Sequence, residues 1–198
     1  MKIIGIDFDN TIVTYGSIFY DIAKEKDLIE AKSTLSKTEV RDLLIKEGKE
    51  ELFTYIQGLV YGPRIVDAEP SPGVIKKLIE LKHKGYKLIL VSHKTRYPIK
   101  GDKHDLHAAC MNWLTKNGFF KSDGIGWGPE DLYFAETKEE KAVIVKEQAC
   151  DLFIDDLPSM LDLIQEVSPK TSKLLYDPCN IHSSCSHKRL QSWKELEI

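Results

Sequence analysis

The 198-residue sequence lacks the features that would assign it to several special classes of protein. No apolar stretch approaches the roughly 20 residues that a membrane-spanning helix needs. Its four cysteines are too few and too dispersed for a disulfide framework. The formal net charge is only −3, and there is no basic stripe of the kind that binds nucleic acid. We therefore expect a globular protein with neither a membrane nor a nucleic-acid partner.

The first residues also lack the features of a secretion signal. The apolar run from Ile3 to Ile6 is short, and Asp7 follows it without a small-residue cleavage site. We expect a cytoplasmic protein whose length suffices for one buried domain, or for a core and a small accessory unit.

Short apolar runs alternate with helical patterns along most of the chain. The runs cover residues 2–6, 88–91, 152–154 and 174–176, and the helical patterns begin near residues 71, 104, 137 and 158. Runs this short without polar alternation are typical of strands covered on both faces. The alternation of strands and helices along the chain predicts an α/β fold, with a three-layer Rossmann-like core built on a parallel sheet.

One segment interrupts this alternation. Residues 15–68 read as helices only, over about 18–27, 37–47 and 49–60. We interpret residues 15–68 as an inserted helical cap, and residues 1–14 and 69–198 as the catalytic core.

Polar side chains follow the predicted strands. Asp7 and Asp9 follow the first, Ser92 ends the second, and Asp155 and Asp156 end a later one. The carboxyl ends of parallel strands meet at one edge, where ligands bind. Two carboxylates about 4 Å apart repel by about 4 kcal/mol at an effective dielectric constant of 20. Four of them together require protons or a cation, and oxygen ligands favour Mg²⁺.

A lysine near the same edge is expected at the start of the helix that Thr137 caps. If residues 132–134 form a strand, this helix starts beside the acidic residues. Lys141 and Lys138 compete for contact with a phosphate, and we favour Lys141.

Two polar segments have open interpretations. The loop after Ser92 carries His93 and Lys94, which either contact a substrate phosphate or belong to a solvated loop. The set Cys179, His182, Cys185 and His187 has ligand types that zinc accepts, but its tight spacing favours a polar surface loop.

These motifs resemble those of the haloacid dehalogenase (HAD) superfamily. The family's D-x-D-x-T motif is matched by residues 7–11, and its strand ending in Ser or Thr by Ser92. Its lysine is matched by Lys141, and its late acidic pair by Asp155 and Asp156. The motifs occur in the family's order over nearly the whole chain, and residues 15–68 look like its small helical C1-type cap.

The resemblance implies a role for each catalytic residue. Asp7 would attack phosphorus and form an aspartyl-phosphate, and Asp9 would act as general acid and base. Lys141 would neutralise charge on the nucleophile and the phosphate. Thr11 would form hydrogen bonds, and Ser92 would bind phosphoryl oxygens.

The resemblance also implies a magnesium cofactor. Asp7, the backbone carbonyl of Asp9, and Asp155 would hold Mg²⁺, and Asp156 would act through a water molecule or from outside the set of direct ligands. The cation would offset the repulsion between Asp7 and a phosphate anion.

The function expected from these residues is Mg-dependent hydrolysis of a small phosphate monoester. The segments Ser92–Thr95, 137–141 and 154–158 look similar to phosphatase-like proteins encoded among bacterial polysaccharide genes, which favours a sugar-type phosphate. A nucleotidase, or a phosphoryl transferase such as a mutase, would share the same site. A phospho-aspartate signalling module is the non-enzymatic alternative, but in such modules the acidic pair follows the first strand.

Overall fold

The computed structural model describes residues 1–30 and 34–198. They form two compact units. The core unit comprises Met1–Val13, Pro70–Lys94 and Thr115–Ile198, and the helical unit comprises Thr14–Glu69 and Thr95–Leu114. The predicted insertion 15–68 lies in the helical unit, apart from residues 31–33, which fall outside the described residues. The helical unit also includes the segment after the strand that ends near Ser92.

A six-stranded sheet forms the centre of the core unit. Its strands are β1 (Ile3–Ile6), β4 (Lys87–His93), β5 (Leu132–Ala135), β6 (Leu152–Asp155), β7 (Ser172–Tyr176) and β8 (Arg189–Leu190). They lie in the order β5-β4-β1-β6-β7-β8, and every neighbouring pair is parallel. The predicted Rossmann-like parallel sheet is therefore confirmed.

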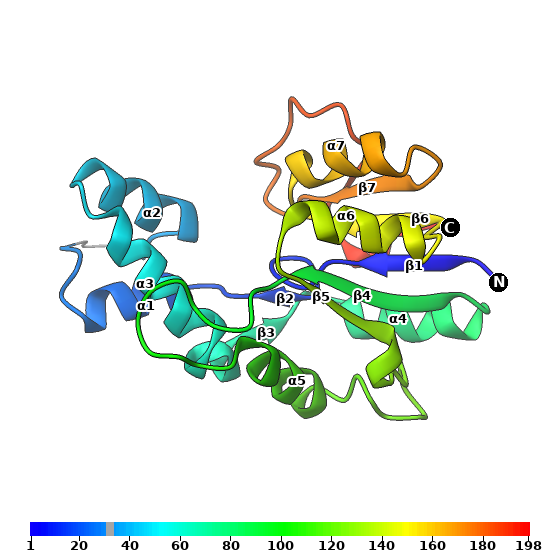
Figure 1. Ribbon diagram of the computed structural model, residues 1–198, viewed down its shortest axis with the longest axis horizontal. Coiled ribbons are helices and arrows are strands. Elements are labelled where there is room, and N and C mark those ends of the chain that lie inside the picture. The colour runs from blue at the N-terminus through cyan, green and yellow to red at the C-terminus, as the bar shows by residue number, and fades with distance from the viewer. Residues whose placement is uncertain (31–33) are drawn as a thin grey trace. The chain divides into compact units, whose positions relative to one another are not determined.

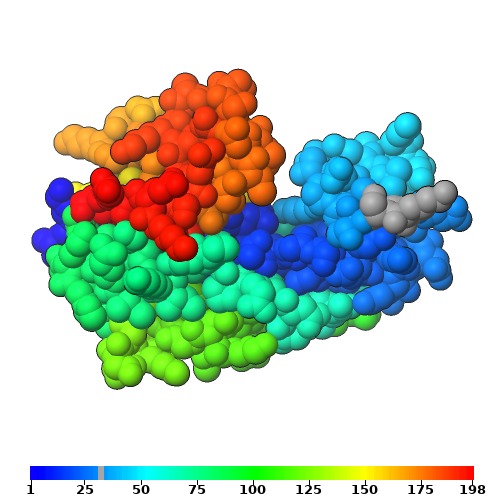
Figure 2. Space-filling model, turned by 180° about the vertical axis from the view of Figure 1, so that it is seen from behind, coloured from blue at the N-terminus to red at the C-terminus, as the bar shows by residue number. Residues whose placement is uncertain are grey.

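Helices cover both faces of this sheet (Figure 1). Helices α6 (Lys138–Glu147) and α7 (Pro158–Val167) pack against each other, α6 on β4 and β5 and α7 on β6 and β7. Helix α4 (Val74–His83) lies on the opposite face with the 3₁₀ helix η3 (Trp193–Glu195). Figure 2 shows the C-terminal residues, in red, beside the green atoms of α4, where Lys77 Nζ donates to the Leu196 carbonyl at 3.0 Å.

The register of the central strands brings three strand ends to one edge. Ile6 of β1 lies opposite Leu90 of β4 and Ile154 of β6. The residues that follow β1 and β6, and those at the end of β4, therefore share the carboxyl edge. The continuous apolar character of these strands fits their burial on both faces.

The helical unit contains α1 (Ile18–Glu25), α2 (Lys37–Lys46), α3 (Glu50–Tyr61), η1 (Pro63–Asp67) and most of α5 (Leu106–Lys116). An aromatic cluster lies in its interior. The rings of Phe19 and Phe53 stack with their centres 5.7 Å apart, and the ring centres of Tyr15 and Tyr61 are 5.2 Å apart. The short strands β2 (Val13–Thr14) and β3 (Glu69–Pro70) pair with each other in a second, two-stranded sheet.

Residues 95–114 belong to the helical unit because they pack on its helices. A methyl group on Gly58 of α3 would lie 2.8 Å from Cβ of Pro98, so the loop lies directly on the helix backbone. Trp113 is buried and donates its indole N–H to the Ala68 carbonyl at 2.8 Å. Among the described residues, no helix is both long and apolar enough to span a membrane.

Two local features differ from the sequence prediction. The pattern at Ser71-Pro72 predicts a helix start there, but α4 begins at Val74 because Gly73 adopts a left-handed conformation with φ of 85°. Strand β8 was not predicted, since two residues carry no periodic signal.

Gly5 provides a test of the packing of β1. We expect Gly5→Ala to lower the free energy of unfolding by about 1–3 kcal/mol, the typical cost of overpacking. Its methyl group would lie 2.7 Å from a ring carbon of Phe153 and 3.0 Å from Sγ of Cys150. Urea denaturation measures this effect.

Gly124→Ala is the matched control. Its added methyl group would approach no atom closer than 3.4 Å, so we expect a change within about 0.5 kcal/mol. Equal stabilities of the two variants would contradict the packing described for β1.

Candidate active site

A buried lysine joins the acidic residues of two strands. Lys141 Nζ lies 2.5 Å from Oδ1 of Asp7 and 2.6 Å from Oδ2 of Asp155. All three side chains are almost fully buried. The lysine that contacts the acids is thus Lys141, whereas Lys138 is exposed.

The local structure explains this convergence. Asp7 follows β1, and its N–H donates to the Ile154 carbonyl of β6 at 2.9 Å. Asp155 ends β6, and its Oδ1 accepts from the Leu157 N–H. The hydroxyl of Thr137 accepts from the Glu140 N–H and caps α6, so Lys141 lies in the first turn of this helix.

Asp156 is held beside the same acids by a residue that the sequence prediction missed. Asn10 has a left-handed φ of 59°, and its side-chain amide donates to Asp156 Oδ2 at 3.1 Å. Asparagine tolerates this conformation better than most residues, which could have indicated a turn at this position.

The acidic cluster has the donor set of a divalent-cation site. Asp7, Asp155 and Asp156 each offer a carboxylate oxygen, and these oxygens lie within 4.8 Å of one another. No other group of three or more Asp, Glu, His or Cys side chains meets this criterion in residues 1–30 and 34–198. Three hard oxygen donors suit Mg²⁺ and leave positions for other ligands.

The charges in the cluster do not balance. Burial raises the pKa of Asp7, and the positive charge of Lys141 lowers it. The nearby carboxylates of Asp155, Asp156 and Asp9 raise it again, so the pKa of Asp7 lies well above its ordinary value. Burial lowers the pKa of Lys141, but the attraction of Asp155 and Asp7 outweighs burial and raises it. Both pKa values are raised for the same reason: the single ammonium of Lys141 is attracted by two carboxylates, but it cannot neutralise both of them. The residues therefore fit a cation, which would neutralise the remaining charge.

Asp9 interacts with a second buried lysine. Lys94 Nζ lies 3.2 Å from Oδ1 and 2.9 Å from Oδ2 of Asp9, and 5.4 Å from the centre of the Phe8 ring. The side chain of Lys94 is only 2% exposed, whereas that of Asp9 is 19% exposed. The sequence left Lys94 open between phosphate contact and a solvated loop, and its pairing with Asp9 was not predicted.

The hydroxyl residues lie near the cluster, but His93 does not join it. Thr11 Oγ1 donates to Asp7 Oδ2 at 3.4 Å. Ser92 is fully buried, and its Oγ has no hydrogen-bond partner among the described residues. His93 is exposed, and its Nε2 lies 3.2 Å from the Glu136 carbonyl oxygen.

The Cys and His residues of the tail do not form a metal site in the described structure. Cys179 is exposed, whereas Cys185 packs against the hydrophobic core. His187 pairs with Asp162 at 2.8 Å.

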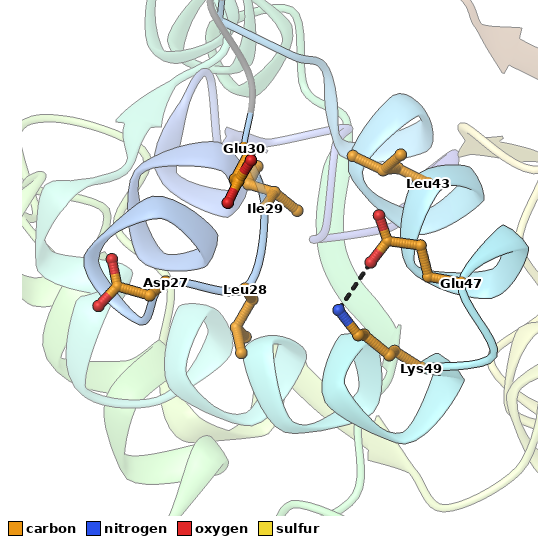
Figure 3. Close-up of a pocket in the computed structure, with 7 residues that line it drawn as sticks. All are labelled: Asp27, Leu28, Ile29, Glu30, Leu43, Glu47 and Lys49. Carbon is orange, nitrogen blue, oxygen red and sulfur yellow. Dashed lines mark hydrogen bonds and ion pairs between the residues drawn. The ribbon is translucent and has the colours of Figure 1, made fainter.

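The helical unit has a pocket of its own, of about 300 Å³ (Figure 3). Its lining residues are Asp27, Leu28, Ile29, Glu30, Leu43, Glu47 and Lys49. The charge of Lys49 is already paired with Glu47 at 2.7 Å. The pocket contains none of the predicted site residues.

Comparison with known proteins reveals relatives along nearly the whole chain. No family model matches the sequence. A protein of Oceanobacillus iheyensis, named a "putative nucleotidase", is 20% identical over 200 residues, which span 97% of this chain and 95% of that protein.

Several solved structures share the fold. A "predicted phosphatase" from Clostridium acetobutylicum has a TM-score of 0.62 at 13% identity, covering 98% of this chain and 95% of that one. The YfnB protein of Bacillus subtilis, described as a "putative HAD-hydrolase" bound to magnesium, has a TM-score of 0.59 at 13% identity, covering 98% and 96%. A HAD-superfamily hydrolase from Ehrlichia chaffeensis has a TM-score of 0.57 at 13% identity, covering 98% and 95%. The chain therefore has the fold of the HAD-superfamily hydrolases, as the motif resemblance predicted.

Replacement of Lys141 tests the charge balance of the cluster. In metal-free protein near neutral pH, we expect Lys141→Met to lower the free energy of unfolding by about 3–5 kcal/mol, because two buried carboxylates lose their cation. The loss should increase with pH. The pKa of Asp7 is already raised in the wild-type protein and rises further without Lys141, so between these two folded-state pKa values only the variant retains a proton that the unfolded state has released, and the loss grows with pH across that window.

Urea denaturation in EDTA at about pH 5 and pH 7 measures this dependence. Lys138→Met, at an exposed position one turn earlier on α6, is the control and should change stability by less than about 0.5 kcal/mol at both pH values. A pH-independent loss for Lys141→Met would argue against the charge balance described here.

Proposed function

We propose that this protein is a magnesium-dependent phosphohydrolase that cleaves a small phosphate monoester through an aspartyl-phosphate on Asp7. The observation that carries this proposal is the position of Lys141, which contacts both Asp7 and Asp155 at the carboxyl edge of the sheet. The fold supports it, because solved structures with this fold include a HAD-superfamily hydrolase and a "predicted phosphatase".

Asp7 is the proposed nucleophile. One of its oxygens attacks phosphorus, a new P–O bond forms, and the bond to the leaving oxygen breaks. Water then attacks the phosphorus of the aspartyl-phosphate and releases inorganic phosphate and the Asp7 carboxylate. Lys141 attenuates the charge on Asp7 and lies close enough to attract the incoming phosphate.

Asp9 is the proposed proton shuttle. It donates a proton to the leaving oxygen in the first step, and its carboxylate accepts a proton from the attacking water in the second. Its partial exposure, in contrast to the burial of Asp7, suits a group that must reach substrate and water.

Phosphoryl oxygens would be bound by hydroxyl donors. The Ser92 Oγ is buried and has no hydrogen-bond partner within residues 1–30 and 34–198. Such burial normally costs free energy, so it is consistent with a donor that binds a ligand. Thr11 supports Asp7 by its hydrogen bond. His93 and Lys94 were also predicted to contact phosphate, but their contacts to Glu136 and Asp9 make other roles more suitable.

Asp7, Asp155, Asp156 and the backbone carbonyl of Asp9 would hold Mg²⁺. A bound divalent cation supplies positive charge that offsets the repulsion between the nucleophile and the phosphate. The bound magnesium described for the Bacillus subtilis structure of the same fold supports this choice of metal.

The substrate class has two candidates. A sugar-type phosphate follows from the sequence motifs, whereas a nucleoside monophosphate is favoured by the name of the Oceanobacillus iheyensis relative. Comparison of kcat/KM for sugar phosphates and nucleotides in one assay distinguishes the two. ¹⁸O-labelled water distinguishes hydrolysis, which places the label in the released phosphate, from transfer to another acceptor.

Replacement of the nucleophile tests the proposed reaction. We expect Asp7→Asn to lower kcat for p-nitrophenyl phosphate by at least about 10³-fold, because a neutral amide cannot form the aspartyl-phosphate. Release of p-nitrophenol measures the rate, and circular dichroism checks that the variant is folded.

Asp162→Asn is the control, since Asp162 is exposed and pairs with His187 in the same unit. It should retain wild-type activity. Substantial turnover by folded Asp7→Asn would rule out the nucleophile assignment.

Magnesium should stabilise the folded protein as well as activate it. At a free Mg²⁺ concentration of 100 times Kd, we expect about 2.7 kcal/mol of added stability, because the unfolded chain does not assemble the acidic cluster. Thermal unfolding of EDTA-treated protein, with and without MgCl₂ at constant ionic strength, measures this effect.

Asp155→Asn should lose most of this stabilisation, and Asp162→Asn should keep it. An unchanged Tm for the wild-type protein up to millimolar Mg²⁺, or full activity in excess chelator, would contradict the magnesium proposal.

A further inference from the structure

Lys94 lies at the end of β4 in a position that the backbone fixes. Its N–H donates to the Ala135 carbonyl at 2.9 Å, which continues the ladder between β4 and β5 beyond His93. The side chain then runs inward and is only 2% exposed. An ammonium this deeply buried requires an anionic partner, because an unpaired buried charge costs several kcal/mol.

That partner is Asp9. The Nζ atom lies within 3.2 Å of both carboxylate oxygens of Asp9, so the ion pair restrains the orientation of the carboxylate as well as its charge. The Phe8 ring, 5.4 Å from Nζ, adds a cation–π contact on another side. Asp9 sits in the turn after β1, and a short aspartate side chain can otherwise rotate between several orientations.

A proton shuttle depends on this orientation. General acid catalysis requires the donor to lie within about 2.6–3.2 Å of the oxygen that it protonates. On the basis of the function proposed above, we infer that Lys94 is a positioning residue, which holds the carboxyl group of Asp9 toward the leaving oxygen and does not itself bind the substrate phosphate.

The proposed step balances without a further reactant. As the P–O bond to the leaving group breaks, Asp9 transfers its proton to the leaving oxygen and becomes a carboxylate. Lys94 keeps its proton throughout, and its ammonium holds the carboxylate that has formed. In the second step the same carboxylate accepts a proton from the water that attacks phosphorus.

This role predicts a dependence on the leaving group. Phenolate is a stronger base than p-nitrophenolate, so hydrolysis of phenyl phosphate relies more on protonation than hydrolysis of p-nitrophenyl phosphate does. The two esters otherwise have the same phosphoryl group and nearly the same size. Loss of the positioning residue should therefore affect phenyl phosphate more.

The experiment compares Lys94→Met with the wild-type protein on both esters in the presence of Mg²⁺. We expect kcat/KM to fall at least about tenfold more for phenyl phosphate than for p-nitrophenyl phosphate. This difference is smaller than the rate enhancement of about 10²–10⁴-fold that a general acid typically contributes, because only the position of Asp9 is disturbed. Inhibition by inorganic phosphate should stay within about twofold of wild type, because the phosphate contacts remain. Lys94→Arg, which keeps the positive charge, should restore part of the selective loss.

Two controls separate this role from a structural one. Lys77→Met removes another largely buried lysine of the same unit, paired with Glu80, and should leave the ratio of the two esters unchanged. Asp9→Asn should show the same selective loss, and Lys94→Met added to Asp9→Asn should lower kcat/KM little further, because both changes remove one function.

Two results would overturn the inference. An equal loss on both esters together with weaker inhibition by phosphate would identify Lys94 as a phosphate-binding residue. Unchanged kinetics in folded Lys94→Met would show that the ion pair is not needed for the reaction. Failure of the proposed function itself would look different, since wild-type protein would then hydrolyse neither ester, or Asp7→Asn would remain active, and the inference would fail with it.

Discussion

The concentration of negative charge at one buried edge of the sheet is the constraint on which the rest of the structure depends. Asp7, Asp155 and Asp156 place carboxylate oxygens within 4.8 Å of one another, and Lys141 supplies a single ammonium to two of them. Even at an effective dielectric constant of 20, each unit pair at such distances is worth about 4 kcal/mol. The fold therefore maintains an arrangement that favours a bound cation, and this need agrees with a reaction on a phosphate anion.

The sheet can hold this charge only because its strands are fixed in register. Asp7 is tied to β6 by its backbone N–H, and Asp155 is tied to the turn before α7 by Leu157. The strands themselves are short and apolar, and they are buried under helices on both faces. Hydrophobic packing on either side of the sheet thus provides the rigidity that carboxylates in repulsive contact require. Ser92 is buried at the same edge, at the end of β4, and its Oγ has no hydrogen-bond partner in the part of the chain that the structure describes.

Sequence patterns predicted the elements that carry a long or repeated signal. The parallel sheet, the helices of residues 15–68 and the contact of Lys141 with the acids all follow from apolar runs, caps and the order of motifs. Local backbone choices were harder to predict. The left-handed Gly73 delays α4, and β8 is too short to show periodicity. The pairing of Lys94 with Asp9 depends on the direction of a side chain 85 residues away, which no local pattern encodes.

The two buried lysines illustrate how one kind of side chain can serve two chemical needs. Lys141 contacts the carboxylates of Asp7 and Asp155, and it is as buried as they are. In the proposed reaction, Asp7 attacks phosphorus and Asp155 binds the cation. Lys94 contacts Asp9, the proposed proton shuttle, which is the more exposed member of this pair. A single lysine shared by both sites would have to fix the position of Asp7 and also pair with Asp9, whose charge changes in the proposed reaction. In the proposed reaction, one lysine on α6 and another directly after β4 would let Asp7 stay fixed while Asp9 exchanges protons.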